Sequence, residues 1–168
     1  MSAPGTRGRA FVYGDNIDTD MLAPGIYMKF AVAEIAKHCL EAIDPDFAKT
    51  VRPGDIVVGG ENFGMGSSRE QAVMALRELG VRVVVAKSFA GLFFRNCVNL
   101  GVAPLVCARA SEIAKDDELD ADAAKGTIAN RTRGAVYPCE PLPAHLLAML
   151  DDGGLMPHLE KKLKKGKA

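Results

Sequence analysis

Residues 57–80, VVGGENFGMGSSREQAVMALRELG, carry the pattern from which the fold of this chain is best deduced. The stretch predicts a buried β-strand, a glycine-rich turn and an amphipathic helix that ends at Gly80. Gly64 and Gly66 permit positive φ angles, and they let a ligand approach the backbone closely. A strand, a turn and a helix in this order are typical of a binding loop in an α/β protein.

Polar residues at the start of that helix offer two overlapping N-terminal caps. Ser67 with Glu70, and Ser68 with Gln71, each have the Ser-x-x-Glu/Gln spacing of a capping box. One serine can serve as the cap, which leaves the other hydroxyl free to face outward. Because a helix N-terminus attracts anions and Arg69 adds a guanidinium suited to a carboxylate or phosphate, we interpret this turn as an anion site. The alternative is a well-capped helix beside a surface arginine.

The segments around this stretch predict an α/β fold with a parallel or mixed sheet. A mostly β-branched run at 81–86 is typical of a strand buried on both faces. The acidic, polar segment 111–125 is assigned no element. The other expected elements are strands at 9–13, 55–58 and 102–106, helices at 31–43, 47–51, 69–79, 89–100 and 143–150, and a hairpin at 127–136. Ligands of such folds gather at the carboxyl ends of the strands, where the Gly64–Arg69 turn falls.

Length and composition favour one globular domain over residues 1–168, with flexible tails at 1–8 and 160–168. Apolar residues make up 48% and charged residues 25%, which is ordinary for a globular protein. The formal net charge of zero argues against a nucleic-acid binder. We find no signal peptide and no apolar run long enough to span a membrane, so we expect a cytoplasmic protein.

Several common sites are excluded by spacing. The four cysteines are far apart and share no metal-ligand spacing with the three histidines, so we expect no metal site in this chain. Asp15, Asp18 and Asp20 lie close together but lack the glycine and glutamate of a calcium loop, and a turn-rich loop is the alternative. The glycine-rich turn lacks the lysine of a P-loop, the third glycine of a Rossmann fingerprint and the second glycine of a nucleophile elbow.

Three motifs resemble those of the aconitase and isopropylmalate isomerase family. NFGMGSSREQA, at 62–72, is similar to the N-[FY]-G-x-G-S-S-R-E-[HQ]-A motif of its swivel domain. YGDNIDTDMLAPG, at 13–25, and KSFAGLFFRNCVNLG, at 87–101, match two further motifs in the same order. The resemblance implies a three-layer β/β/α swivelling domain with a mixed, largely parallel sheet flanked by helices. The chain length fits a separately encoded small subunit.

The resemblance also implies roles for individual residues. Ser67 would be the base that removes or returns the substrate proton, and Arg69 would grip a substrate carboxylate with help from Ser68. Asp20 would belong to the active-site hydrogen-bond network, while Gly64 and Gly66 shape the anion-binding loop. The family's [4Fe–4S] cluster lies on a large subunit, with which the small subunit forms a heterodimer or heterotetramer. The substrate would be a small di- or tricarboxylate.

The implied reaction is the isomerisation of 2-isopropylmalate and 3-isopropylmalate by dehydration and rehydration, a hydro-lyase step of leucine biosynthesis. Gln71 and Met65 depart from residues common in the family, but neither is a named catalytic group. In relatives the loop that corresponds to residues 25–30 contacts the variable group of the substrate, so the resemblance implies that Lys29 favours a polar substrate unless it faces solvent. A homoaconitase activity and a 2,3-dimethylmalate dehydratase-like activity are therefore alternatives for the substrate. Two alternatives of other classes are a stand-alone anion-binding module and a nucleotide-binding α/β protein.

Overall fold

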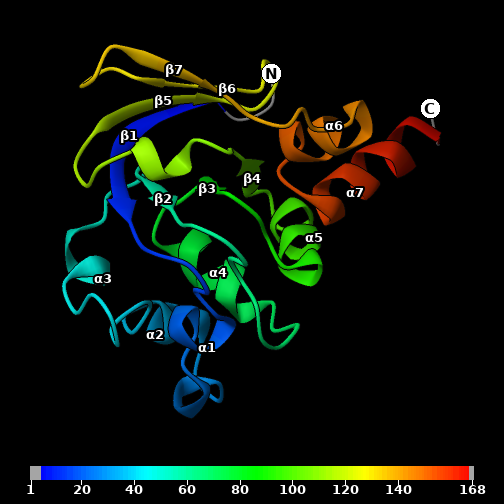
Figure 1. Cartoon of the computed structure of the whole chain (residues 1–168). Coiled ribbons are helices and arrows are strands. Elements are labelled where there is room, and N and C mark those ends of the chain that lie inside the picture. Colours follow the sequence, from blue (N-terminus) through cyan, green and yellow to red (C-terminus); the bar gives the residue numbers. More distant parts are fainter. Residues whose placement is uncertain (1–4, 167–168) are drawn as a thin grey trace.

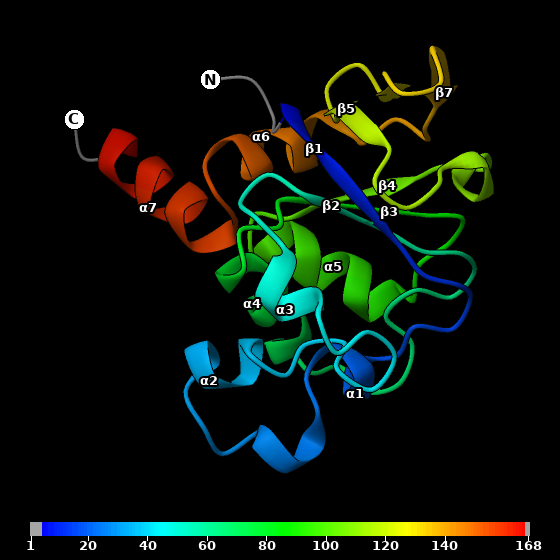
Figure 2. The ribbon, with the colours of Figure 1, turned by 90° about the vertical axis from the view of Figure 1, so that its left-hand side faces the viewer.

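The computed structural model describes residues 5–166, which form a curled seven-stranded sheet with helices packed against it (Figures 1 and 2). The strand order is β4-β3-β2-β1-β5-β6-β7. The strands are β1 (Gly5–Val12), β2 (Ile56–Val58), β3 (Val83–Ala86), β4 (Ala103–Val106), β5 (Glu118–Asp122), β6 (Thr127–Asn130) and β7 (Ala135–Pro138). The α-helices are α1 (Thr19–Leu22), α2 (Val32–Ala36), α3 (Phe47–Thr50), α4 (Gln71–Glu78), α5 (Gly91–Asn99), α6 (Ala144–Asp151) and α7 (Leu155–Gly166). Two short 3-10 helices are η1 (Gly25–Tyr27) and η2 (Ala110–Glu112).

The sheet has a parallel half and an antiparallel half that share β1. Residues 10–12 of β1 pair in parallel with β2, and β3 and β4 extend this half. Residues 5–9 of β1 pair antiparallel with β5, and β6 and β7 continue from there. The expected mixed α/β sheet is confirmed. Its parallel and antiparallel pairs are equal in number, at three each.

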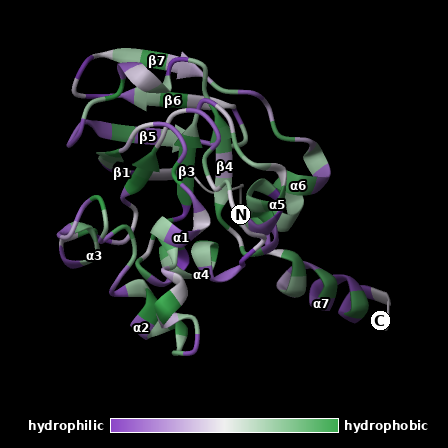
Figure 3. Cartoon of the chain, turned by 60° about the horizontal axis from the view of Figure 1, so that its bottom comes forward, coloured by the Kyte–Doolittle hydropathy of each residue, from purple (hydrophilic) through white to green (hydrophobic). Residues whose placement is uncertain are grey.

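Two apolar cores lie on the two faces of the parallel half. Val57 of β2 and Val84 of β3 belong to the core beneath the helices, together with buried residues of α4. Val83 and Val85, on either side of Val84 in the chain, belong to the second core, which β5, β6 and β7 help to close. Alternate side chains of a strand point to opposite faces, and both faces are covered here. This explains why residues 83–86 of β3 are apolar without a break, as Figure 3 shows for the central strands (green).

The structure gives the conformation of part of the two expected tails, and it corrects two of the expected elements. In the tails, residues 5–8 pair with β5 and residues 160–166 belong to α7, while residues 1–4 and 167–168 lie outside the described part. The segment 111–125 contains β5, whose outward positions are acidic. The helix expected at 31–43 ends at Ala36 and continues as turns. No helix between residues 5 and 166 is both long and apolar enough to cross a membrane.

Candidate active site

Three loops meet at one edge of the sheet, where β1, β2 and β3 end. They are residues 13–18, 59–70 and 87–90. The Asp15 carboxylate accepts a hydrogen bond from the Glu61 amide at 2.7 Å. The Ser88 hydroxyl accepts from the Asn62 amide and donates to the Glu61 carboxylate, each at 2.8 Å. These bonds join the three motifs of the sequence into one surface.

The two glycines of the central loop have the positive φ angles expected of them. Gly64 has φ 84° and Gly66 has φ 107°. A Cβ atom on Gly64 would collide with the ring of Phe93 in α5, so no other residue fits there without rearrangement. The Gly64 amide donates to the Ile17 carbonyl at 2.7 Å, and the Thr19 amide donates to the Met65 carbonyl at 2.8 Å. The loop is therefore fixed by its backbone against the loop that follows β1.

Ser67 is exposed and lies against Thr19. The Ser67 amide donates to the Thr19 hydroxyl at 3.1 Å, and the two hydroxyl oxygens are 3.2 Å apart. Because the Thr19 oxygen already accepts the amide proton, its own proton is free to be donated to the Ser67 oxygen. Thr19 itself is buried, with 3% of its surface exposed. A buried hydroxyl thus supports an exposed one, which is an arrangement suited to stabilising negative charge on Ser67.

The predicted capping boxes are wrong. Helix α4 begins at Gln71, and its N-cap is Glu70, which makes no side-chain cap and has a helical backbone (φ −62°, ψ −29°). Ser67 is turned instead toward Thr19, and Ser68 is fixed through its carbonyl, which accepts from the Asn96 side chain at 3.1 Å. Tertiary contacts have replaced the local caps, which leaves both serine residues on the surface.

Arg69 lies between the two motif loops. Its Nη1 donates to the Ala23 carbonyl at 2.9 Å and to the Asp20 carboxylate at 3.2 Å. Asp20 also accepts from the Gly25 amide at 2.8 Å, and these two donors, the amide first, lower the pKa of its carboxyl group. Both bonds of the guanidinium start from Nη1, and within residues 5–166 no partner holds Nη2 or Nε. The Nη2 and Nε side of the Arg69 guanidinium is therefore available to a carboxylate.

The remaining predicted residues occupy different places. Asp18 caps α1, since its carboxylate accepts from the Met21 amide at 2.8 Å, so it is structural. Lys29 is exposed just after η1, and among the described residues its amino group has no ion-pair partner. The same segment exposes Ile26 and Phe30, at 78% and 55% of their surface. Whether Lys29 contacts a substrate stays a prediction.

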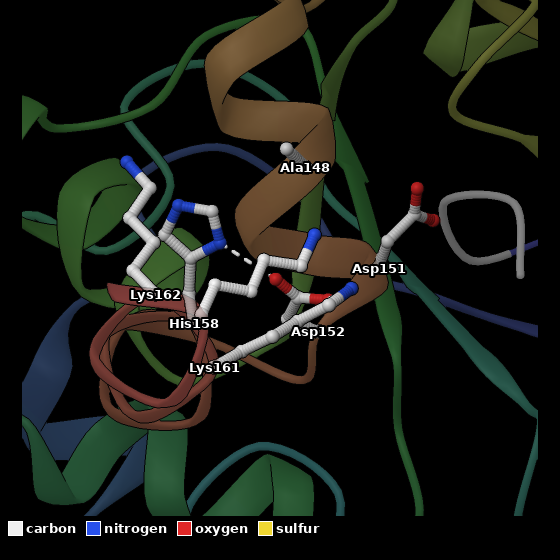
Figure 4. A pocket seen from close by; sticks show the side chains of 7 residues that line it. Ala148, Asp151, Asp152, His158, Lys161 and Lys162 are labelled. Atoms are coloured by element: carbon white, nitrogen blue, oxygen red, sulfur yellow. Dashed lines mark hydrogen bonds and ion pairs between the residues drawn. The ribbon is translucent and has the colours of Figure 1, made fainter. Parts of the chain in front are cut away.

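A second polar cluster lies away from these loops, between α6 and α7. Here Asp152 accepts from His158 at 2.6 Å and from Lys161 at 3.0 Å, beside a hollow of about 310 Å³ (Figure 4). His158 and then Lys161 lower the pKa of Asp152. Because Asp152 at the end of α6 is bonded to His158 and Lys161 of α7, the cluster holds α7 against α6. It does not share residues with the Ser67 surface.

The described residues do not fit an iron–sulfur cluster or another metal. Within residues 5–166, no three side chains of histidine, cysteine, aspartate or glutamate gather as metal ligands. All four cysteine residues are buried and free of disulfides. Cys39 and Cys97 are enclosed in the core, and burial raises the pKa of each thiol.

Two residues that position the site have no role in the sequence-based prediction. Thr19 is the hydrogen-bond partner of Ser67, and Asn96 holds the Ser68 carbonyl. Both stand inside the quoted motifs, Thr19 between two aspartates and Asn96 in the apolar helix α5. The sequence signal that could have identified them was a polar, uncharged side chain among acidic or apolar neighbours. Their partners, 48 and 28 residues away, become visible once the chain is folded.

The fold and this loop surface define the class of protein. The chain belongs to the aconitase C-terminal domain family, whose model matches residues 27–110. The 3-isopropylmalate dehydratase small subunit 2 of Archaeoglobus fulgidus is 47% identical over 156 residues, 92% of this chain and 94% of that protein. The methanogen homoaconitase small subunit of Methanothermobacter thermautotrophicus is 45% identical and covers 95% of this chain and 94% of its own. The crystal structure of 3-isopropylmalate dehydratase from Methanocaldococcus jannaschii superposes with a TM-score of 0.92 at 40% identity, covering 98% of this chain and 99% of the other.

Proposed function

We propose that this chain is the small subunit of a hydro-lyase that interconverts 2-isopropylmalate and 3-isopropylmalate by dehydration and rehydration. The names of its relatives support the activity, and the exposed Ser67 hydroxyl beside Thr19 and Arg69 supports the chemistry. The observation that carries the proposal is the 3.2 Å contact between the Ser67 and Thr19 hydroxyls at the edge where three strands end. Ligands of α/β sheets commonly bind at this edge, which supports a catalytic role for Ser67.

Ser67 is the proton acceptor in this proposal. It takes the proton from the substrate carbon next to a carboxylate, and it returns that proton to the neighbouring carbon in the rehydration step. A serine is a weak base, so its alkoxide needs a donor and a nearby positive charge. The Thr19 hydroxyl supplies the donor, and the Arg69 guanidinium supplies the charge on the adjacent surface.

Arg69 is the carboxylate receptor. Its Nη1 is fixed by the Ala23 carbonyl and by Asp20, so the guanidinium is held in place before the substrate arrives. Removal of a proton beside a carboxylate increases the negative charge on that carboxylate. Arg69 therefore stabilises the transition state more than the bound substrate, which raises the rate of the chemical step. Ser68, which is exposed beside Arg69, completes the cradle.

The proposal includes a large subunit that closes this surface. Ser67, Ser68 and Asp20 are exposed, and proton abstraction by a serine requires that bulk water be excluded. In the proposed assembly the partner would carry a [4Fe–4S] cluster, which would take up the departing hydroxyl group. This chain contributes the base and the carboxylate receptor.

Homoaconitate hydration is the second candidate activity. A relative named as a homoaconitase small subunit is nearly as similar as the isopropylmalate dehydratases. Lys29 would pair with the distal carboxylate of such a substrate, whereas the neighbouring Ile26 suits an isopropyl group. A 2,3-dimethylmalate dehydratase-like activity is the third substrate option.

The test is to mix the purified chain with an isopropylmalate dehydratase large subunit and to measure kcat/KM for 2-isopropylmalate, homoaconitate and 2,3-dimethylmalate. We expect no turnover by the chain alone and the highest value for 2-isopropylmalate in the mixture. Dicarboxylate binding without turnover in any mixture would instead identify a stand-alone anion-binding module. A thermal shift with ATP or NAD and none with dicarboxylates would identify a nucleotide-binding protein.

A further inference from the structure

Residues 25–30, which we call the η1 loop, begin directly beside the carboxylate receptor. The Gly25 amide donates to the Asp20 carboxylate at 2.8 Å, and the same carboxylate accepts from Arg69 at 3.2 Å. A Cβ atom on Gly25 would lie 3.9 Å from Nη1 and from Nη2 of Arg69. A carboxylate held by Arg69 is therefore next to the first residue of the η1 loop.

Few polar contacts attach the η1 loop to the rest of the chain. The loop projects beside α1 and α2 (blue in Figures 1 and 2). Among the described residues, its hydrogen bonds stay within residues 24–30 except for the bond from Gly25 to Asp20. Ile26 and Phe30 are exposed. A loop with so few fixed contacts needs a further anchor to hold one position.

An aromatic stack supplies this anchor. The rings of Tyr27, in the η1 loop, and His38, in the turns after α2, have centroids 3.6 Å apart and an interplanar angle of 7°. Tyr27 is half-buried and packs against the core beneath the helices. Aromatic pairs in such an arrangement stabilise the contact beyond the area that they bury. The stack thus fixes the middle of the loop, as the Gly25 bond fixes its start.

His38 is itself held in place. Its Nδ1 donates to the Glu41 carboxylate at 2.7 Å, and its Nε2 lies 3.7 Å from the Glu34 carboxylate. The turn that carries His38 is joined to α1, because the Leu40 amide donates to the Met21 carbonyl at 2.8 Å. Helix α1 also carries the carboxylate partner of Arg69. The platform under the η1 loop and the carboxylate receptor are therefore parts of one connected frame.

We propose that His38 is a positioning residue, whose stack on Tyr27 holds the η1 loop beside Arg69 so that the loop contacts the part of a bound dicarboxylate that extends beyond the gripped carboxylate. The inference rests on the proposed function, since it takes Arg69 to be the substrate receptor. His38 acts through Tyr27 and does not touch the substrate. Because a loop that is fixed in advance needs no ordering when the substrate binds, the stack lowers KM and leaves the proton transfer at Ser67 unchanged.

The kinetic experiment measures kcat and KM for 2-isopropylmalate with the full chain reconstituted with a large subunit. His38→Ala should raise KM about fivefold and keep kcat within about twofold, because it removes the stack and not the base. His38→Phe, which keeps a flat ring, should bring KM back to within about twofold of the unmodified value. His145→Ala, at an exposed histidine of α6, is the matched control with unchanged constants. An unchanged KM for His38→Ala, or an equal loss in the Ala and Phe variants, would overturn the proposal.

A double-variant cycle tests whether His38 acts through Tyr27. Tyr27→Ala should raise KM by a factor similar to that of His38→Ala. The double variant should raise KM no further, because the second substitution removes a contact that is already lost. If the two factors multiplied instead, the two residues would act independently, and the stack would not be the positioning contact.

Hydrogen exchange of the chain alone separates this inference from the proposed function. Peptides that cover residues 25–30 should exchange at least about threefold faster in His38→Ala than in the unmodified chain, while those that cover α4 should not change. Equal exchange of residues 25–30 in both chains would overturn the inference whatever the activity. An active unmodified pair with an unaltered His38→Ala variant would overturn this inference alone, whereas an unmodified pair without turnover on any tested substrate would overturn the proposed function as well.

Discussion

Two arginine–carboxylate pairs in different parts of the sheet have the same chemistry and opposite burial. Asp117, before β5, is 5% exposed at its side chain and pairs with Arg133 at 2.9 Å. Asp20, in α1, has a side chain that is 70% exposed, and it pairs with Arg69 at 3.2 Å. The Asp117 carboxylate also accepts bonds from the Ala114 amide and the Asn130 side chain. The first pair is saturated by its own chain, and the second faces solvent.

The difference indicates what each pair is for. Burial raises the pKa of Asp117, but the bonds from Ala114, Asn130 and Arg133 outweigh it and lower the pKa below its ordinary value. The Asp117 carboxylate therefore stabilises the fold, and its hydrogen bonds within the chain leave none for a ligand. Arg69 is held by one nitrogen, so its other nitrogens remain free to bind a carboxylate. We therefore expect substitutions in the antiparallel half to change stability, and substitutions at the loop surface to change turnover.

The largest expected effect is that of Ser67→Ala on turnover. Loss of the base should lower kcat of the reconstituted enzyme by about 10³-fold, because positioned proton transfer contributes a factor of this order. The free energy of unfolding should stay within about 0.5 kcal/mol of the unmodified value, since the residue is exposed. Ser111→Ala, at an exposed position in η2, is the control with unchanged turnover. Near-normal kcat for Ser67→Ala would remove Ser67 from the base role.

The next effect tests the other half of the comparison. Asp117→Ala should lower the free energy of unfolding by about 3 kcal/mol, because the Ala114 amide and the buried Asn130 side chain lose their acceptor. Urea unfolding measures this change, and kcat should be unaffected. Asp20→Ala is the matched control, with a stability change below about 1 kcal/mol.

The pH dependence of stability separates the same two residues. The pKa of folded Asp117 is below the ordinary value of 3.8, so its contribution to stability is present above pH 3.8 and is lost as the pH falls below it. Asp117→Ala should remove that part of the acid sensitivity. If Asp117→Ala and the unmodified chain showed the same change of unfolding free energy with pH below 3.8, the Asp117 carboxylate would not be a stabilising group.

Much of the parallel half could be predicted from the sequence, because local and tertiary preferences agree there. The run at 83–86 is apolar at every position, since both faces of β3 are covered. In β5 the alternation of apolar Leu119 and Ala121 with acidic residues was present, but the acidic composition suggested a loop. The turns that follow α2 stop before residue 43, because Leu40 adopts φ 61° and its amide donates to the Met21 carbonyl.

The loop at residues 59–70 shows why the rest could not be predicted. Its residue types and glycine positions were sufficient to locate it. The orientation of Ser67 depends on Thr19, which is 48 positions away, and that contact outweighs the local capping pattern. Capping boxes stabilise a helix by about 1 kcal/mol, so a few tertiary hydrogen bonds are enough to replace them.

Arg69→Lys should have an intermediate effect. An ammonium cannot reproduce the two-point contact of a guanidinium, so we expect kcat/KM to fall by about 30-fold, with a higher KM. Arg133→Lys makes the same exchange at the stabilising pair and should leave kcat/KM unchanged. If both variants lost activity equally, the effect would be one of folding, and the distinction between the two pairs would fail.

The smallest expected effect concerns substrate choice at Lys29. If this lysine faces the variable group of the substrate, Lys29→Val should shift the ratio of kcat/KM values toward isopropylmalate and away from homoaconitate by about fivefold, because a charge is exchanged for an apolar group. Stability should not change, since among residues 5–166 the amino group has no ion-pair partner. Lys125→Val, at an exposed turn between β5 and β6, is the matched control from the antiparallel half and should leave the ratio unchanged. If Lys29→Val and Lys125→Val gave the same ratio of kcat/KM values, Lys29 would face solvent. The partner subunit or the neighbouring apolar residues Ile26 and Phe30 would then determine the choice of substrate.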